Sequence, residues 1–250
     1  PLIRACLTRR VPVVFLNQQG WCQGRLHPLE DGYRHRARYQ QQLGEGERLT
    51  AARRLISSKI ANGRVLLLRL TRRQRSQELA AVIERLRWHS QQVERAKDQD
   101  RLRGLEGNAA GEYFTALGIL LEGDGFPFLG RHRRPPTTAF DAVCGFGYSL
   151  LWNAMMTRTE LQGLDPYEGV LHAGSPRHAA LVSDLIEPLR TLLVDPFNVW
   201  MIRTKRLQAE RDFEARDGGV YLSDGGRQIW LKSWGHYMAE TVTLANGRRG

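Results

Sequence analysis

Apolar residues recur at helical spacing almost without interruption from about residue 33 onward, and this pattern constrains the fold more than any other feature. The segment 75–103 is the clearest case, because its apolar residues are spaced to form one face among many charges. Those residues are Leu79, Val82, Ile83, Leu86 and Val93. Candidate helices lie near 47–62, 75–102, 105–122, 138–162, 177–193, 197–215 and 224–240. The sequence therefore predicts a mainly α protein.

The first 28 residues have a different character. Val11, Val13, Val14 and Phe15 form a β-branched and aromatic run, and the sequence of residues 17–20 is typical of a turn. These strands are too few to form a sheet of their own. We therefore expect residues 1–28 to be the end of a β-rich amino-terminal domain and residues 29–250 to form a helical domain. The chain begins with Pro1, so we also expect it to be a segment of a longer polypeptide.

The charge of the chain indicates a polyanionic partner. The formal net charge is +11, and only four of the 37 basic residues are lysine (Lys59, Lys97, Lys205 and Lys232), which leaves 33 arginines. Arginine presents a planar fork of donors that suits phosphate oxygens. The alternative is an ordinary surface that happens to be rich in arginine.

Other features of the composition favour a cytoplasmic protein without a membrane segment. The longest apolar runs, at 11–16 and 65–70, are far shorter than the roughly 20 residues that a bilayer requires. Three cysteines without paired spacing do not suggest a zinc site or a disulfide framework.

Candidate metal ligands occur in three places: Glu106, His172, and the pair Asp184 and Glu187. On a helix, two carboxylates three positions apart lie on one face, so Asp184 and Glu187 could serve one site. Small residues follow Glu106 and would let another helix or a DNA backbone approach it. Carboxylates with one imidazole suit Mg²⁺ or Mn²⁺. Taken singly, each acid has a simpler explanation as a solvated charge, and His172 has one as a hydrogen-bonded buried residue.

Four segments in this order resemble the integrase of CRISPR adaptation systems. They are ISSKIANGRVLLLR at 56–69, LEGNAAGEYFTAL at 105–117, RHRRPPTTAFDAVCGFGYSLLWN at 131–153 and GVLHAGSPRHAALVSDLIEPLR at 169–190. The resemblance implies a β-rich amino-terminal domain followed by a helical catalytic domain. It also implies that Glu106, His172 and Glu187 bind a catalytic Mg²⁺ or Mn²⁺. Asp184 then supports a ligand, or takes the ligand role if the register is shifted.

The same resemblance indicates which residues contact DNA. Arg131, Arg133, Arg134 and Tyr148 are similar to the DNA-handling stretch of the family, and Arg190 follows the last metal ligand closely enough to meet a phosphate. The alternatives are a solvated loop for the arginines and a core position for Tyr148. One residue departs from the family pattern, because Asp141 stands where an Asn is usual. A carboxylate repels phosphate, which puts a DNA contact at Asp141 in doubt.

The implied function is the joining of a captured DNA fragment, through its 3′ hydroxyl, to the CRISPR repeat by transesterification. The implied partners are DNA, a second copy of the chain and a small ferredoxin-like companion protein. The resemblance leaves open whether a reverse transcriptase precedes Pro1. Two other functions stay open: a metal-dependent nuclease that does not integrate, and a non-catalytic basic module that binds nucleic acid.

Overall fold

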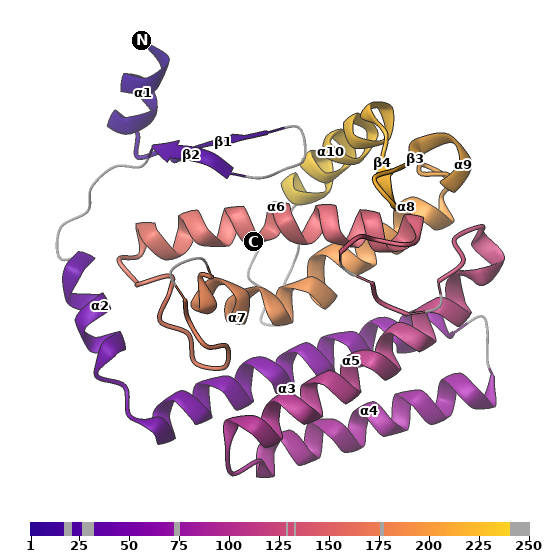
Figure 1. Ribbon diagram of the computed structural model, residues 1–250, viewed down its shortest axis with the longest axis horizontal. Helices are drawn as coiled ribbons and strands as arrows, with labels where there is room; N and C mark the ends of the chain where they lie inside the picture. Colours follow the sequence, from indigo (N-terminus) through magenta and orange to yellow (C-terminus); the bar gives the residue numbers. More distant parts are fainter. Residues whose placement is uncertain are drawn as a thin grey trace.

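A computed structural model describes residues 1–17, 22–26, 33–72, 76–128, 130–132, 134–175 and 178–240. It confirms a mainly α fold with a small β element near the amino terminus. Helices α3 (Glu45–Leu70), α4 (Gln77–Arg95) and α5 (Gln99–Leu121) each contact the other two and together form the first layer of the fold (Figure 1). Within the described segments, no helix is both long enough and apolar enough to cross a bilayer.

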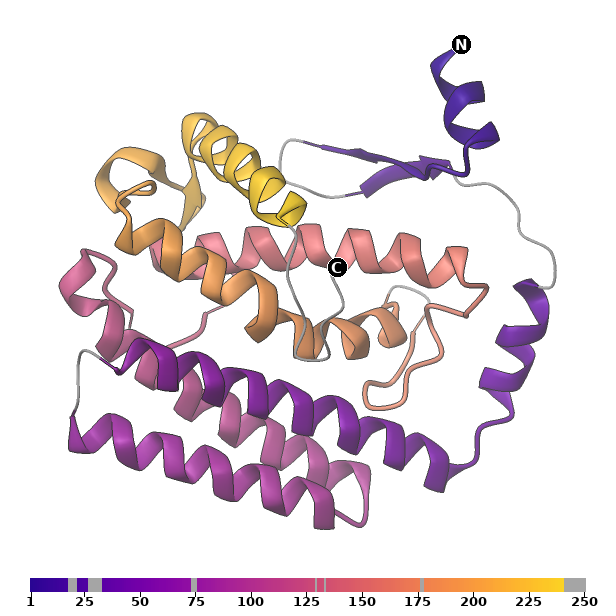
Figure 2. The same ribbon diagram turned by 180° about the vertical axis from the view of Figure 1, so that it is seen from behind.

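The second layer is built on the long helix α6 (Ala139–Leu161). Helix α7 (Ala180–Leu189) lies between α6 and α3 and contacts both, as Figures 1 and 2 show. It continues through a single π-helical turn, Arg190–Val194, into α8 (Asp195–Arg203). Because α7 contacts α3 on one side and α6 on the other, its side chains can meet residues from both layers.

The carboxyl-terminal part closes one end of α6. A short helix, α9 (Ala209–Asp212), leads into the antiparallel strands β3 (Phe213–Arg216) and β4 (Gly219–Leu222), and α10 (Asp224–Ala239) follows. Trp230 of α10 is fully buried and donates a hydrogen bond from its indole nitrogen to Asn198 of α8 (2.9 Å). This contact ties the last helix to the second layer.

The amino-terminal region contains a helix that the sequence pattern did not indicate. Helix α1 (Leu2–Thr8) precedes strands β1 (Val13–Leu16) and β2 (Cys22–Leu26), which pair in antiparallel fashion as the β-branched run predicts. The predicted turn at 17–20 lies mostly outside the described residues, and so does the predicted domain boundary at residue 28. Helix α2 (Tyr33–Gln41) then leads into α3. The division at residue 28 stays a prediction.

Two helix predictions are wrong in detail. The predicted helix at 75–102 ends at Arg95, because Asp98 caps a new helix by accepting a hydrogen bond from the backbone N–H of Arg101 (2.7 Å). The predicted helix at 197–215 ends at Arg203, and residues 213–216 form β3 instead. Residues 213–216 form a strand because the two-residue turn Asp217–Gly218 pairs them with β4. The positive φ angles of this turn (50° and 73°) are those of a tight hairpin.

Candidate active site

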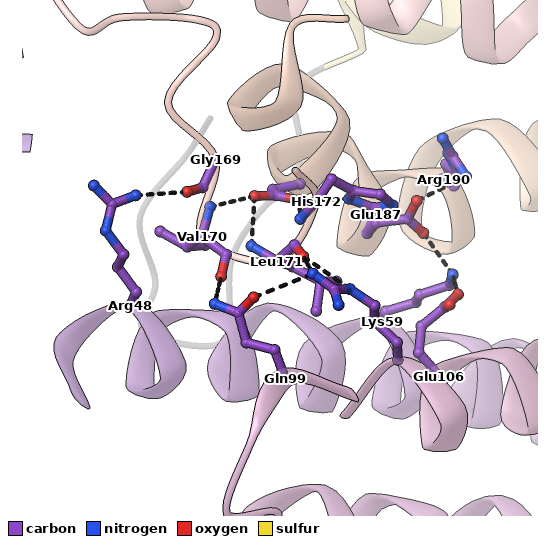
Figure 3. A network of polar contacts seen from close by, with 12 residues as sticks. Arg48, Lys59, Gln99, Glu106, Gly169, Val170, Leu171, His172, Glu187 and Arg190 are labelled. Carbon is purple, nitrogen blue, oxygen red and sulfur yellow. Dashed lines mark hydrogen bonds and ion pairs between the residues drawn. The ribbon is translucent and has the colours of Figure 1, made fainter. Parts of the chain in front are cut away.

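Glu106 and Glu187 meet on one cation, the ammonium group of Lys59. Glu106 lies on α5, Glu187 on α7 and Lys59 on α3, and Figure 3 shows the three side chains pointing toward one another. The Lys59 Nζ donates a hydrogen bond to Glu106 Oε1 and lies 2.5 Å from Glu187 Oε2. The second contact is a buried ion pair. Two carboxylates from separate helices thus already share a positive charge.

The charge around Glu187 keeps its carboxylate ionised. Burial by itself raises the pKa of Glu187, because water no longer solvates the charged form. The positive charges of Arg190 and Lys59 outweigh this effect and hold the pKa below its ordinary value. The Arg190 Nη1 lies 2.9 Å from Glu187 Oε1, on the side of the carboxylate away from Lys59. Glu187 is therefore available as an anionic ligand.

His172 is held by Asp184, which is fully buried. The His172 Nδ1 lies 2.5 Å from Asp184 Oδ1. Since an ionised carboxylate can only accept, Nδ1 carries the proton and Nε2 carries the free lone pair. Asp184 also accepts hydrogen bonds from three successive backbone N–H groups, those of Val170 (2.6 Å), Leu171 (2.9 Å) and His172 (3.1 Å). With both oxygens occupied, Asp184 fits a supporting role, and Glu187 fits the ligand role.

The three backbone carbonyls of the same loop are bound from the other layer. Arg48 of α3 donates to the carbonyl of Gly169 (2.9 Å), and two residues of α5 bind the next two carbonyls (Figure 3). Gln99 donates to Val170 O (2.9 Å), and Arg103 donates to Leu171 O (2.8 Å). The backbone that leads to His172 is therefore fixed on both its N–H side and its carbonyl side.

Gly169 begins this loop, and its lack of a side chain is required there. A Cβ at this position would lie 2.7 Å from Ala180 Cβ and 2.9 Å from Asp184 Oδ2, which is closer than such atoms approach. Any other residue would push α7 away from the loop. The close packing brings Asp184 within reach of the three N–H groups.

The candidate ligands do not yet surround a common point. Within the described ranges, no three His, Cys, Asp or Glu side chains lie close enough to hold one ion as they stand. Lys59 gives a physical reason, because its ammonium fills the space between Glu106 and Glu187.

Three of the residues expected to contact DNA gather beside this centre. The guanidinium groups of Arg190 and Arg131 lie over the Tyr148 ring, at 5.0 Å and 5.6 Å from its centre. The Tyr148 hydroxyl donates to Asp195 Oδ1 (2.5 Å), and Tyr113 donates to Asp195 Oδ2 (2.8 Å). Tyr148 is half-buried and has a fixed ring, so it is neither a free surface aromatic nor a pure core residue.

A second group of residues lines an open groove of about 740 Å³ between α6, the loop before it and the β3–β4 hairpin. Arg131, Tyr148 and Arg190 line the groove, and so do the exposed Arg134 and two arginines of the carboxyl-terminal part, Arg216 and Arg227. Arg133 lies outside the described residues. The groove is thus lined by guanidinium groups from several elements, and one of them, that of Arg190, pairs with Glu187.

Asp141 has a structural role that accounts for its departure from the family pattern. It is fully buried and accepts hydrogen bonds from Arg131 Nη1 (2.8 Å) and from the backbone N–H of His132 (3.0 Å). The Thr138 side chain caps α6 by accepting from the Asp141 backbone N–H (3.0 Å). Asp141 therefore fixes Arg131 and does not itself face the groove as a free anion.

Sequence reasoning missed several residues of the centre. Lys59 lies in the quoted segment 56–69, but a lysine on a helix is normally a solvated charge, and only the pairing of α3 with α5 and α7 gives it a role. Asp195 follows the apolar run TLLV and precedes a proline, which suggests a helix start and no more. No local sequence pattern indicated a role in the site for Arg48, Gln99 or Arg103.

Comparison with known proteins identifies the family of the chain. Residues 1–236 match the family model described as CRISPR associated protein Cas1. The chain is 36% identical over 245 residues to the CRISPR-associated endonuclease Cas1 2 of Rhodospirillum rubrum, covering 93% of this chain and 70% of that protein. It is 32% identical over 252 residues to a Cas4 exonuclease/Cas1 endonuclease fusion of Geobacter sulfurreducens, covering 96% of this chain and 44% of the fusion.

A solved structure shows the same fold. The Cas1 protein TM1797 of Thermotoga maritima superposes with a TM-score of 0.78 at 25% sequence identity, and the match covers 95% of this chain and 75% of that one. The chain thus spans less than half of the Geobacter fusion and about three quarters of the Thermotoga protein.

Proposed function

This chain belongs to the CRISPR-associated Cas1 family, and from that premise we propose that it is a metal-dependent DNA integrase of CRISPR adaptation. In the proposed reaction the 3′ hydroxyl of a captured DNA fragment attacks a phosphodiester of the CRISPR repeat. A new phosphorus–oxygen bond forms as the old one breaks. The attacking oxygen loses a proton, and the departing 3′ oxygen gains one. The exchange needs no external energy source, because one phosphodiester replaces another.

The convergence of Glu106 and Glu187 on a single positive charge carries this proposal. Their oxygens are hard ligands, and the Lys59 ammonium stands where a cation would be held between them. His172 offers the lone pair of Nε2, because Asp184 holds the ring proton at Nδ1. The three residues fit Mg²⁺ or Mn²⁺, and the imidazole favours Mn²⁺ somewhat. When bound, such an ion polarises the phosphodiester and stabilises the attacking and leaving oxygens.

The other residues of the centre orient the ligands and the DNA. Asp184 fixes the tautomer of His172 and the direction of its ring. Arg190 holds one oxygen of Glu187 and lies over Tyr148, so it links the metal ligands to the groove. We place the DNA in that groove, where Arg131, Arg134 and Arg190 meet phosphates and Tyr148 offers an aromatic edge.

The proposed partners follow from membership of the family. They are DNA, a second copy of the chain in a homodimer, and a small ferredoxin-like companion protein. A reverse transcriptase joined to the same polypeptide would extend the source of captured fragments to RNA. The net charge of +11 supports the nucleic-acid partner, because a positively charged surface attracts a polyanion.

A joining assay tests the proposal. The purified protein is incubated with a labelled fragment bearing a 3′ hydroxyl and with CRISPR repeat DNA, in Mn²⁺, in Mg²⁺ or in EDTA. We expect joined product with either ion, none in EDTA, and none from Glu106→Gln or Glu187→Gln. Glu84→Gln on α4 is the matched control, because the Glu84 side chain is exposed and far in sequence from both ligands.

The products distinguish the other functions. Cleaved fragments without joined product would indicate a metal-dependent nuclease that does not integrate. DNA binding that is unaffected by EDTA and by Glu106→Gln, with no covalent product, would indicate a non-catalytic module. Equal joining by wild type and Glu187→Gln would refute the assignment of the metal ligands.

A further inference from the structure

Lys59 occupies the position that the proposed function gives to a metal ion. Its ammonium contacts Glu106 and Glu187 at once, and its side chain is only 12% exposed. We infer that Lys59 is a built-in counter-ion, which holds the two carboxylates before a metal binds and turns toward the DNA when the metal displaces it. This inference rests on the proposed function, because it assumes that a divalent ion binds between these carboxylates.

The ammonium and a metal ion cannot share these oxygens in the present arrangement. The Lys59 Nζ lies 2.5 Å from Glu187 Oε2, so a dication bound to the same oxygen would lie close to a group of like charge. That repulsion is strong in a buried site, where water screens it poorly. One of the two cations has to leave, and the ammonium is on a flexible stem of four methylene groups.

The backbone of Lys59 cannot make this movement. The Lys59 carbonyl accepts a hydrogen bond from the Thr191 hydroxyl (3.2 Å), which joins α3 to the π turn. The next residue, Ile60, is buried in the core. Displacement is therefore confined to the side chain, which can rotate without disturbing α3.

A cavity beside Lys59 can receive the displaced side chain. A small cavity borders Lys59 and is also lined by Arg131, Tyr148, Arg190 and Asp195. It lies against the groove, with which it shares Arg131, Tyr148 and Arg190. An ammonium that turns into this cavity joins the guanidinium groups of Arg131 and Arg190 beside the single carboxylate of Asp195, so a DNA phosphate would balance the positive charge that is left over. Metal binding would thus add one phosphate contact to the groove.

Titration with Mn²⁺ tests whether Lys59 competes with the metal ion. Binding is measured by calorimetry or by the loss of the free Mn²⁺ signal in electron paramagnetic resonance, for wild type, Lys59→Met and Lys59→Arg. We expect Lys59→Met to bind Mn²⁺ at least about tenfold more tightly, and Lys59→Arg to show no gain because it keeps the charge. The matched control is Lys97→Met, at an exposed lysine in the break between α4 and α5.

A folding control accompanies the titration. Without Lys59 the two carboxylates face each other and only Arg190 is left beside Glu187, so Lys59→Met should melt below wild type in EDTA and recover when Mn²⁺ is added. Lys59→Gln is the second variant, since a neutral amide can donate to both carboxylates and keep the fold. It should also bind Mn²⁺ more tightly than wild type.

The salt dependence of DNA binding tests whether the displaced Lys59 contacts the DNA. Binding of single-stranded DNA is measured over a range of salt concentrations, with Mn²⁺ and with EDTA. With Mn²⁺ the wild-type slope of log K against log salt should be steeper than that of Lys59→Met by about 0.7, the value for one phosphate contact on a single strand. In EDTA the two slopes should agree.

The outcomes separate this inference from the proposed function. If wild type binds Mn²⁺ and neither neutral variant binds it more tightly, Lys59 does not compete with the metal and the inference is overturned. If wild type and Lys59→Met have equal salt slopes for DNA binding with Mn²⁺, Lys59 does not move to the DNA and that part of the inference is overturned. If neither wild type nor the neutral variants bind Mn²⁺, the metal centre itself is wrong and the proposed function fails with it.

Discussion

The His172 ring and the Asp184 carboxylate form one unit, in which Asp184 Oδ1 accepts both from the ring Nδ1 (2.5 Å) and from the His172 backbone N–H (3.1 Å). A metal ligand is thereby oriented at two points by a single oxygen. The other oxygen of Asp184 binds the two preceding residues of the loop. The position of the imidazole therefore depends on one buried carboxylate.

Asp184→Asn should weaken both folding and metal binding. An amide keeps one acceptor and presents an NH₂ group to donors on its other side, so at least one buried N–H loses its partner. We expect the free energy of unfolding to fall by about 1–3 kcal/mol and the affinity for Mn²⁺ to fall by about 10- to 100-fold. Urea unfolding and Mn²⁺ titration measure the two effects. Asp217→Asn, at an exposed residue of the turn between β3 and β4, should change neither.

Arg103→Met should loosen the loop before His172 without touching a ligand. The variant leaves the Leu171 carbonyl without its guanidinium donor, which we expect to reduce stability by about 1–3 kcal/mol. Amide hydrogen exchange at residues 170–172 should rise, and the affinity for Mn²⁺ should fall. Arg101→Met is the control, because Arg101 is exposed on the same helix. Unchanged exchange in Arg103→Met would show that the loop holds its shape without α5.

Asp195→Asn should stabilise the protein at neutral pH. Burial raises the pKa of Asp195 to about 6, although hydrogen bonds from Tyr148 and Tyr113 lower it. Since the pKa in the folded protein exceeds that of the unfolded chain, the ionised carboxylate destabilises the fold above pH 6, and this effect disappears as the pH falls toward 4. The stabilisation by Asn should be no more than about 3 kcal/mol at pH 7.5 and should shrink by pH 4.5.

Urea unfolding of wild type and Asp195→Asn at the two pH values measures this difference. An advantage of the same size at both pH values would mean that ionisation of Asp195 is not its cause. A variant less stable than wild type at pH 7.5 would mean that the hydrogen bonds of the two tyrosines outweigh the cost of the buried charge.

Two variants, Tyr148→Phe and Tyr148→Ala, should distinguish the contribution of the Tyr148 ring to DNA binding from that of its hydroxyl. Phe keeps the aromatic face under Arg131 and Arg190, so its affinity for single-stranded DNA should stay within about twofold of wild type. Ala removes the face and should weaken binding by about 1–3 kcal/mol. Fluorescence anisotropy with a labelled oligonucleotide measures both. Equal losses in the two variants would instead assign the effect to the hydrogen bond with Asp195.

The sequence predicted those parts of the fold that depend on local pattern. The apolar residues expected on one face of the segment 75–103, among them Leu79, Leu86 and Val93, are all buried. The pattern failed where a short polar signal interrupts it. Asp98 starts a new helix within a stretch rich in charged residues, and the hairpin turned by Asp217–Gly218 takes residues 213–215 out of an expected helix.

The candidate site was predictable only in part. Glu106, His172 and Glu187 came from a resemblance to a family, and of these the structure brings Glu106 and Glu187 together on Lys59. Lys59 and Asp195 could not be predicted, because their partners are 47 and 82 residues away in the sequence. Nothing in the neighbouring sequence distinguishes such a residue from an ordinary helix charge.

The single π turn between α7 and α8 holds one residue more than a regular α turn. In the turn the Asp195 backbone N–H bonds to the Arg190 carbonyl, so residues five apart stand one above the other. Deletion of one residue from 191–194 would put Asp195 four residues after Arg190, where the same N–H and carbonyl close an ordinary α turn. Asp195 would then still face both tyrosines. A deletion of the exposed Leu192 should therefore be tolerated, whereas an added residue would rotate α8 by about 100° relative to α7.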